Sequence, residues 1–214
     1  MTAEPRAGGA PVPPPVSVWN VANGVTAIRL LMVPLFAWLL MREGGASGWG
    51  RLPAAGAFLV AAATDRLDGD LARSRGLITD VGKIADPVAD KALVGAALVC
   101  LSVLGELPWW VTAVVLTREI GITLMRFVII KHGVMPAGRG GKAKTATQLL
   151  AIVLYLVPLP GAWHWAAVAV MGVAVFLTVA SGLEYVFQAI RLVATSERTR
   201  QRRAGRAARG GAAD

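Results

Sequence analysis

Long apolar stretches separated by short polar connections occupy the middle of this chain. Six such stretches follow one another, at about residues 21–41, 52–72, 84–104, 108–130, 144–157 and 165–193. A helix needs about 20 residues to cross a hydrocarbon core of ~30 Å, and only the fifth stretch is clearly shorter. No stretch alternates apolar and polar residues, and no repeat of 20–50 residues is visible, which disfavours a β-barrel or a solenoid. The pattern predicts an all-α integral membrane protein with six transmembrane helices.

The two ends of the chain differ from this central region. Residues 1–17 are rich in Ala, Gly and Pro and lack the apolar core of a signal peptide, so we expect a disordered N-terminal tail. Residues 195–214 carry six arginines among Ala and Gly. We expect a second disordered tail there, which either lies on an anionic membrane face or only improves solubility. The predicted parts of the chain are therefore an N-terminal tail at 1–17, a six-helix membrane domain at 18–194 and a C-terminal tail at 195–214.

The composition agrees with a membrane protein. Hydrophobic residues make up 55% of the 214 residues and charged residues 16%, whereas a soluble domain carries roughly 25% charge. The mean hydropathy is +0.57, which excludes a soluble domain and disorder of the whole chain. A net charge of +9 is common in nucleic-acid-binding proteins. Here the basic residues lie at segment ends and in the tail, so membrane lipids are expected as partners and nucleic acid is not.

The basic residues of the connections predict the orientation in the membrane. The connections at 73–83 and 131–144 contain seven Lys and Arg residues, and those at 105–107 and 158–164 contain none. Because basic connections stay inside, we expect both termini and the two basic connections on the cytoplasmic side of the cell membrane. Four tryptophans would then form an aromatic belt on the outer side: Trp109, Trp110, Trp163 and Trp165.

Four aspartates stand on the second and third apolar segments, where carboxylates are costly and indicate function. Asp65 and Asp68 are three residues apart at the end of the second segment, and Asp86 and Asp90 are four apart at the start of the third. Each spacing places a pair on one helix face. Because a short turn joins the two helices, we expect the pairs to face each other at the cytoplasmic membrane edge.

Four carboxylates brought together repel one another unless cations neutralise them. Oxygen ligands without nearby Cys or His suit Mg²⁺ or Mn²⁺ rather than zinc. Four carboxylates suffice for two bridged metal ions, an arrangement that serves phosphoryl transfer. The alternative is a set of solvated loop carboxylates paired with neighbouring basic residues, which are Arg66, Arg73, Arg75 and Lys91.

Small residues and an arginine accompany the aspartates. Gly69 and Ala72 follow Asp65 on the same helix face, and Gly82 precedes Asp86 by one turn. Side chains this small let a bulky ligand approach the backbone. The guanidinium of Arg73 can bind a phosphate with its planar fork. Together with metal ions, these residues predict a nucleotide diphosphate site.

The residues from Asp65 to Asp90 form the pattern D-x2-D-G-x2-A-R-x8-G-x3-D-x3-D without a departure. This pattern resembles the signature of the CDP-alcohol phosphatidyltransferase family, and the resemblance extends over about residues 19–190. It implies the CDP-alcohol phosphotransferase fold, which agrees with six helices. It also implies a homodimer that transfers a phosphatidyl or similar group from a CDP-linked donor to an alcohol and releases CMP.

The resemblance also implies roles for individual residues. Asp65, Asp68 and Asp86 would bind the two metal ions, and Asp90 would share one of them. Asp90 would also act as the general base on the acceptor hydroxyl. The residues implied to line the pocket for the CDP donor are Gly69, Ala72, Arg73 and Gly82, joined by position by Thr79, Asn23 and Thr26.

The second half of the chain carries candidate residues for the acceptor. Arg118 and Arg126 lie two turns apart in the fourth segment and share a face, whereas Glu119 points elsewhere and could pair with another helix. Lys142 and Lys144 stand where the fifth helix begins, and free helix N–H groups there favour a phosphate. The alternative is that these lysines only anchor the helix at the inner membrane face.

Arg118-Glu119, the stretch from Gly141 to Thr145 and the opening "NVANGVTAIRLLMVP" resemble the phosphatidylglycerophosphate synthase branch of that family. The implied substrates are CDP-diacylglycerol and sn-glycerol 3-phosphate, whose phosphate would meet Arg118, Lys142, Lys144 and Arg126. An inositol phosphate or phosphatidylglycerol remains an alternative acceptor. From other classes, a non-catalytic lipid-binding scaffold would not need Asp90. A divalent-cation transporter would place carboxylates near mid-membrane on several helices, whereas these lie at one cytoplasmic turn.

Overall fold

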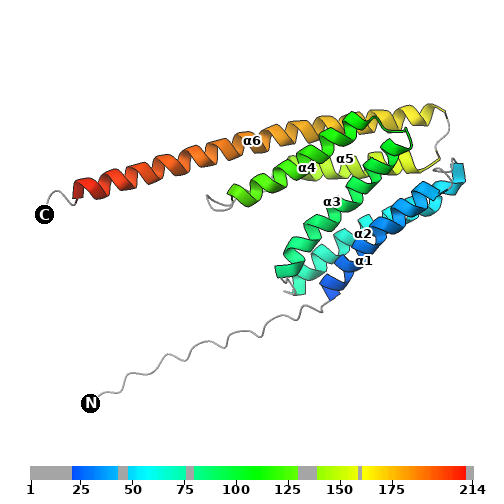
Figure 1. The fold of residues 1–214 in the computed structure, drawn as a ribbon, viewed down its shortest axis with the longest axis horizontal. Coiled ribbons are helices and arrows are strands. Elements are labelled where there is room, and N and C mark those ends of the chain that lie inside the picture. Colours follow the sequence, from blue (N-terminus) through cyan, green and yellow to red (C-terminus); the bar gives the residue numbers. More distant parts are fainter. Residues whose placement is uncertain (1–20, 43–47, 76–79, 130–138, 159–160, 211–214) are drawn as a thin grey trace, which may run out of the picture.

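A computed structural model describes residues 21–42, 48–75, 80–129, 139–158 and 161–210 (Figure 1). At 21–23, 25, 65–75, 80–87, 90, 126–129, 139–142 and 193–210 it describes the backbone alone. The elements in these ranges are all helical: α1 (Val21–Met41), the short 3-10 helix η2 (Gly48–Arg51), α2 (Leu52–Arg75), α3 (Asp80–Val103), α4 (Trp109–Ile129), α5 (Arg139–Leu156) and α6 (Ala162–Gly210). The expectation of an all-α protein is confirmed for the described residues.

The six α-helices coincide with the six apolar stretches, and the largest departure is at the C-terminus. The sequence predicts a helix end near Val193 and a disordered tail after it, but α6 continues to Gly210. The described backbone is therefore helical over residues 195–210, where the sequence predicts a tail. Ala, Arg, Gln and Glu are strong helix formers, and extending an existing helix avoids the cost of nucleation. Residues 1–17 lie outside the described residues.

A shared apolar core joins the helices. α1 packs against α2 and α3, α5 packs against α6 and α2, and α4 contacts both α3 and α6. The largest fully buried side chains come from α1, α2, α3 and α5, and they include Phe36, Leu40, Phe58, Leu98 and Ile152. The rings of Phe36 and Phe58 pack in a tilted arrangement with centroids 5.6 Å apart. Cys100 is buried in the same core, as expected for a small hydrophobic side chain.

The helices alternate in direction, so the bundle has two distinct ends (Figure 1). The α1–α2, α3–α4 and α5–α6 connections meet at one end, where Arg51 forms an ion pair with Glu106 and the ring of His164 lies 5.9 Å from that of Tyr155. We call this the Glu106 end. Gly105 has a φ of 75° there, a conformation that favours glycine, and it ends α3 tightly. The end of α2 and the start of α3 lie at the opposite end, which we call the aspartate end.

Many large apolar side chains point away from the core. Leu31, Trp49, Phe176 and Phe187 are exposed, which is unusual for a protein surrounded by water. One described helix is long and apolar enough to cross a membrane, at Ala162–Leu192 with a mean hydropathy of 2.2. Shorter apolar helices occur at Thr26–Met41, Lys91–Val103 and Ala143–Leu156. The structure is thus all-helical with one candidate span, and six spans remain a prediction.

Candidate active site

The aspartate pattern lies on two consecutive helices. Asp65, Asp68, Gly69, Ala72 and Arg73 fall in the last three turns of α2, and Gly82, Asp86 and Asp90 fall in the first three turns of α3. Only five residue steps separate Arg75 from Asp80, so the two helix ends are at most about 19 Å apart. Both halves of the pattern therefore lie at the aspartate end. Their side chains lie outside the described ones, as does all of Thr79, so their meeting remains a prediction.

The donor set of this region suits a hard divalent cation. The pattern supplies carboxylate oxygens from Asp65, Asp68, Asp86 and Asp90 and contains no His or Cys. Oxygen ligands in this number fit Mg²⁺ or Mn²⁺. Among the residues with described side chains, no group of three or more His, Cys, Asp or Glu could hold a metal ion. The side chains of the four aspartates do not belong to the described ones.

One predicted donor-binding residue on α1 has a described side chain. Thr26 is buried, and Arg29, which is three residues later on the same helix face, is buried as well. Both residues have an interaction partner. Buried polar groups on an otherwise apolar helix need such partners. The side chain of Asn23 lies outside the described part of the chain.

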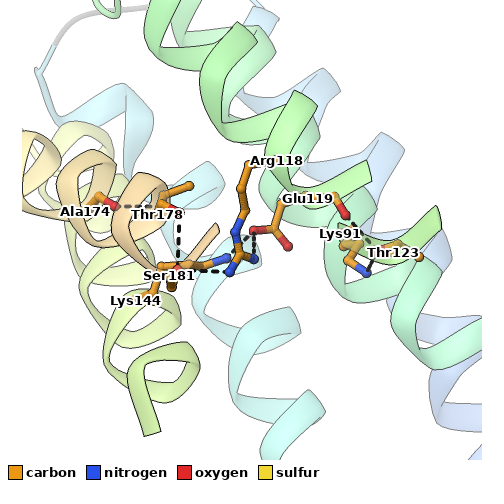
Figure 2. A network of polar contacts seen from close by, with 8 residues as sticks. All are labelled: Lys91, Arg118, Glu119, Thr123, Lys144, Ala174, Thr178 and Ser181. Atoms are coloured by element: carbon orange, nitrogen blue, oxygen red, sulfur yellow. Dashed lines mark hydrogen bonds and ion pairs between the residues drawn. The ribbon is translucent and has the colours of Figure 1, made fainter. Parts of the chain in front are cut away.

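A polar network connects α3, α4, α5 and α6 (Figure 2). At its centre is Glu119 on α4, whose Oε1 accepts hydrogen bonds from two cations. Arg118 donates from Nη1 at 3.0 Å, and Lys144 of α5 donates from Nζ. Lys144 is only 4% exposed. The structure therefore brings together two of the four predicted acceptor residues, Arg118 and Lys144, and Glu119 holds them there.

Arg118 makes further contacts with α6. Its Nη2 donates to Ser181 Oγ at 2.9 Å, and its guanidinium lies 5.8 Å from the ring centroid of Tyr185. A Cβ at Gly182 would lie only 3.1 Å from Cγ of Arg118, so the absence of a side chain there leaves room for the arginine. Ser181 in turn donates to the main-chain oxygen of Thr178 at 3.2 Å. These contacts fix the direction of the guanidinium.

The network also reaches α3 beside the aspartates. Lys91 donates from Nζ to Thr123 Oγ1, and Thr123 donates to the main-chain oxygen of Glu119 at 2.7 Å. Lys91 directly follows Asp90, the predicted general base. The residue next to Asp90 is therefore linked through α4 to the carboxylate that binds Arg118 and Lys144.

Two cationic side chains thus bind the carboxylate of Glu119, and a third, Lys91, is linked to the main chain of Glu119 through Thr123 (Figure 2). A phosphate monoester carries a charge of about −1.5 to −2 near neutral pH, so such a cluster is suited to bind it. Lys142 in the first turn of α5 and Arg126 on α4 were predicted to join, but their side chains are not among those described. Two of the four predicted residues therefore lie together, and their role in acceptor binding stays a prediction.

Sequence reasoning missed several members of this network. It left the partner of Glu119 open, and it gave no role to Thr123, Ser181 and Tyr185. A signal was present, because these polar residues interrupt apolar helices at spacings of three or four. Such spacings place Glu119 beside Thr123 and Thr178 beside Ser181 on single helix faces.

Comparison with known proteins shows which family the chain resembles. Residues 19–180 match the profile of the CDP-alcohol phosphatidyltransferase family. A relative in Mycobacterium tuberculosis, named probable phosphatidylglycerophosphate synthase, is 50% identical over 172 residues, which cover 80% of this chain and 82% of the relative. A Bacillus subtilis relative, named CDP-diacylglycerol--glycerol-3-phosphate 3-phosphatidyltransferase, is 36% identical over 184 residues, which cover 78% of this chain and 94% of the relative.

A third relative carries a different name. The protein of Streptomyces coelicolor named cardiolipin synthase (CMP-forming) is 35% identical over 187 residues, which cover 82% of this chain and 85% of the relative. The family profile spans the aspartate pattern and the network residues Arg118, Glu119 and Lys144, and it ends one residue before Ser181. The chain therefore belongs to the CDP-alcohol phosphatidyltransferase family.

Proposed function

We propose that this protein transfers the phosphatidyl group from CDP-diacylglycerol to sn-glycerol 3-phosphate, giving phosphatidylglycerophosphate and CMP in phospholipid biosynthesis. The observation that carries the proposal is the convergence of Arg118 and Lys144 on Glu119, linked through Thr123 to Lys91. A cationic cluster beside Asp90 is what an acceptor with a phosphate group requires. The names of the Mycobacterium tuberculosis and Bacillus subtilis relatives support the same substrates.

The donor would bind at the aspartate end. Gly69, Ala72 and Gly82 allow close approach of its diphosphate to the helix backbone, and Arg73 binds a phosphate oxygen. Thr26, Asn23 and Thr79 complete this pocket in the proposal. Asp65, Asp68, Asp86 and Asp90 would hold two Mg²⁺ or Mn²⁺ ions, which supply charge neutralisation for the diphosphate and the leaving CMP.

The acceptor would bind between α3, α4 and α5. Arg118 and Lys144, with Lys142 and Arg126, bind its phosphate. Asp90 takes the proton from its terminal hydroxyl, and that oxygen attacks the phosphorus that carries diacylglycerol. A new P–O bond forms to the acceptor while the P–O bond to CMP breaks. Asp90 is therefore the catalytic residue of the proposal.

The proposed membrane arrangement has six spans, a catalytic domain at 18–194 and both termini in the cytoplasm. At the Glu106 end, the ion pair with Glu106 compensates the charge of Arg51, and four exposed tryptophans suit an outer interface. The basic ends of α2 and α5 belong to the aspartate end, which is the cytoplasmic side in this proposal. A homodimer in the cell membrane is part of the same proposal, and its basis is the family resemblance.

The experiment is CMP release by the purified, detergent-solubilised protein with CDP-diacylglycerol and Mg²⁺. The acceptors compared are glycerol 3-phosphate, inositol phosphate and phosphatidylglycerol, and Asp90→Asn serves as the control. We expect release with glycerol 3-phosphate and a loss of about 10³-fold or more in Asp90→Asn, since general-base catalysis contributes up to about 10⁴-fold. Release only with another acceptor contradicts the assignment of glycerol 3-phosphate. No release from folded protein favours a scaffold or transporter.

A further inference from the structure

Gln148 is a buried amide that no step of the proposed reaction uses. It lies in the interior of α5 and is only 3% exposed. Its Nε2 has no hydrogen-bond partner among the described residues. Gln148 follows Lys144 by one helical turn, and both side chains are buried, so they share the inward face of α5. The unsatisfied amide therefore lies beside the cationic network around Glu119.

Several buried hydroxyl side chains of the bundle have partners. Ser102 and Thr112 share a hydrogen bond of 2.7 Å, and Thr178 donates to the main-chain oxygen of Ala174 at 2.6 Å. An unsatisfied buried donor costs free energy, so it is retained where a ligand or an ordered water completes it. Two other buried donor atoms of the described side chains have no hydrogen bond, Nε of Arg29 on α1 and Nε of Arg118. The second belongs to the same network as Gln148, because Arg118 and Lys144 bind one oxygen of Glu119. Two incomplete donors around one cationic cluster indicate a polar ligand larger than a phosphate group.

We propose that the amide of Gln148 binds the acceptor hydroxyl that does not attack, so that Gln148 selects acceptors with a second hydroxyl group. This inference rests on the proposed function. With the acceptor phosphate on Arg118 and Lys144, Gln148 lies one helical turn, about 5–6 Å, further along the same face of α5 and away from the aspartate end. The middle hydroxyl would point toward Gln148 while the terminal hydroxyl points toward Asp90. A three-carbon acceptor extends over such a distance. An amide both donates and accepts, so it matches a hydroxyl group, which does the same.

The test is a comparison of two acceptors in two proteins. Glycerol 3-phosphate has a middle hydroxyl, and 3-hydroxypropyl phosphate lacks it but keeps the terminal hydroxyl and the phosphate. We expect the wild-type protein to prefer glycerol 3-phosphate in kcat/KM by about tenfold or more, because the second acceptor leaves the amide unpaired. In Gln148→Met the ratio of the two kcat/KM values should fall to about one. Only the activity with glycerol 3-phosphate should decrease, and the activity with 3-hydroxypropyl phosphate should stay the same.

Folding is monitored by the thermal midpoint. Methionine is similar in size and removes the unsatisfied donor, so we expect the midpoint to stay or rise. Gln148→Leu is the second variant if Gln148→Met does not fold. Gln188→Met is the matched control, because Gln188 on α6 is only partly buried and its Nε2 donates to Glu184 at 3.0 Å. It should keep the wild-type preference.

The possible outcomes separate the inference from the function on which it rests. A wild-type preference that persists in folded Gln148→Met contradicts the role of Gln148, as does equal loss with both acceptors. A wild-type protein without preference contradicts it as well. Wild-type protein that releases no CMP with either acceptor contradicts the proposed function itself.

Discussion

Glu106 and Glu119 are both acidic residues that bind an arginine, but the rest of their surroundings differ. Glu106 at one end of the bundle pairs with Arg51, and its side chain is 29% exposed. Glu119 lies inside the bundle, where it binds Arg118 and Lys144 and has Lys91 within electrostatic reach. One carboxylate thus faces one cation, whereas the other lies among three.

This difference separates a structural contact from a candidate binding site. A partly exposed pair such as Arg51–Glu106 contributes about 0–1 kcal/mol and ties two connections together. Cations gathered around the carboxylate of Glu119, whose side chain is 15% exposed, are costly to remove from water, and an anionic ligand offsets that cost. The comparison therefore predicts that changes at Glu106 affect stability slightly, whereas changes around Glu119 affect binding.

The largest effect is expected from Glu119→Gln. Removing the carboxylate leaves Arg118 and Lys144 close together without their shared anion, which should cost about 3–5 kcal/mol of stability. The measurement is the thermal midpoint with and without inorganic phosphate. Phosphate should raise the midpoint of the variant more than that of the wild type. Equal shifts in both proteins would show that phosphate does not bind at this cluster.

The next effect concerns Lys144→Met. The variant loses one charge-assisted contact with the acceptor phosphate, worth about 1.5–3 kcal/mol, so the KM for glycerol 3-phosphate should rise by roughly 10- to 150-fold. Steady-state kinetics of CMP release provides the measurement, and the KM for CDP-diacylglycerol should stay the same. Arg51→Met is the control from the other end of the bundle. If both variants raise the acceptor KM equally, the distinction between Glu106 and Glu119 is wrong.

A smaller effect is expected from Gly182→Ala. A Cβ there would lie 3.1 Å from Cγ of Arg118 and would displace the guanidinium, whereas a Cβ at Gly172 of the same helix meets nothing within 4 Å. Overpacking of this kind costs about 1–3 kcal/mol, so we expect a severalfold rise in acceptor KM for Gly182→Ala. Gly172→Ala should behave like the wild type. Identical kinetics in the two variants would show that the position of Arg118 does not govern acceptor binding.

The smallest effect is expected from Arg51→Met itself. Loss of the pair with Glu106 should lower stability by about 1 kcal/mol or less and leave both KM values within about twofold. Thermal unfolding in detergent and steady-state kinetics measure the two quantities. A large loss of activity in folded Arg51→Met would mean that the Glu106 end takes part in the reaction.

The sequence predicts the helices well because their signal is local. Apolar stretches of about 20 residues give α1 with its observed bounds, Val21–Met41, and Gly105 marks the end of α3. Sequence and structure differ where composition is the only guide, because the arginine-rich residues 195–210 predict a polar tail, whereas the described backbone continues α6 there. Periodicity places polar residues on helix faces, but it does not say which faces meet.

The candidate site shows the same limit. The spacing of Asp65 to Asp90 predicts a site from sequence alone, since the residues lie on two consecutive helices. Lys144 and Glu119, which are in contact, lie 25 positions apart in the sequence. Arg118 and Ser181, which share a hydrogen bond, lie 63 positions apart. Such contacts depend on how α4, α5 and α6 pack, which no short pattern encodes.

The most direct test is the binding of glycerol 3-phosphate to Asp90→Asn protein, measured by calorimetry with CDP-diacylglycerol and Mg²⁺ present. This background separates binding of the acceptor from its conversion. We predict saturable binding that is lost when Lys144→Met is added and kept when Arg51→Met is added. Binding that survives Lys144→Met unchanged would contradict the assignment of the cations around Glu119 to the acceptor phosphate.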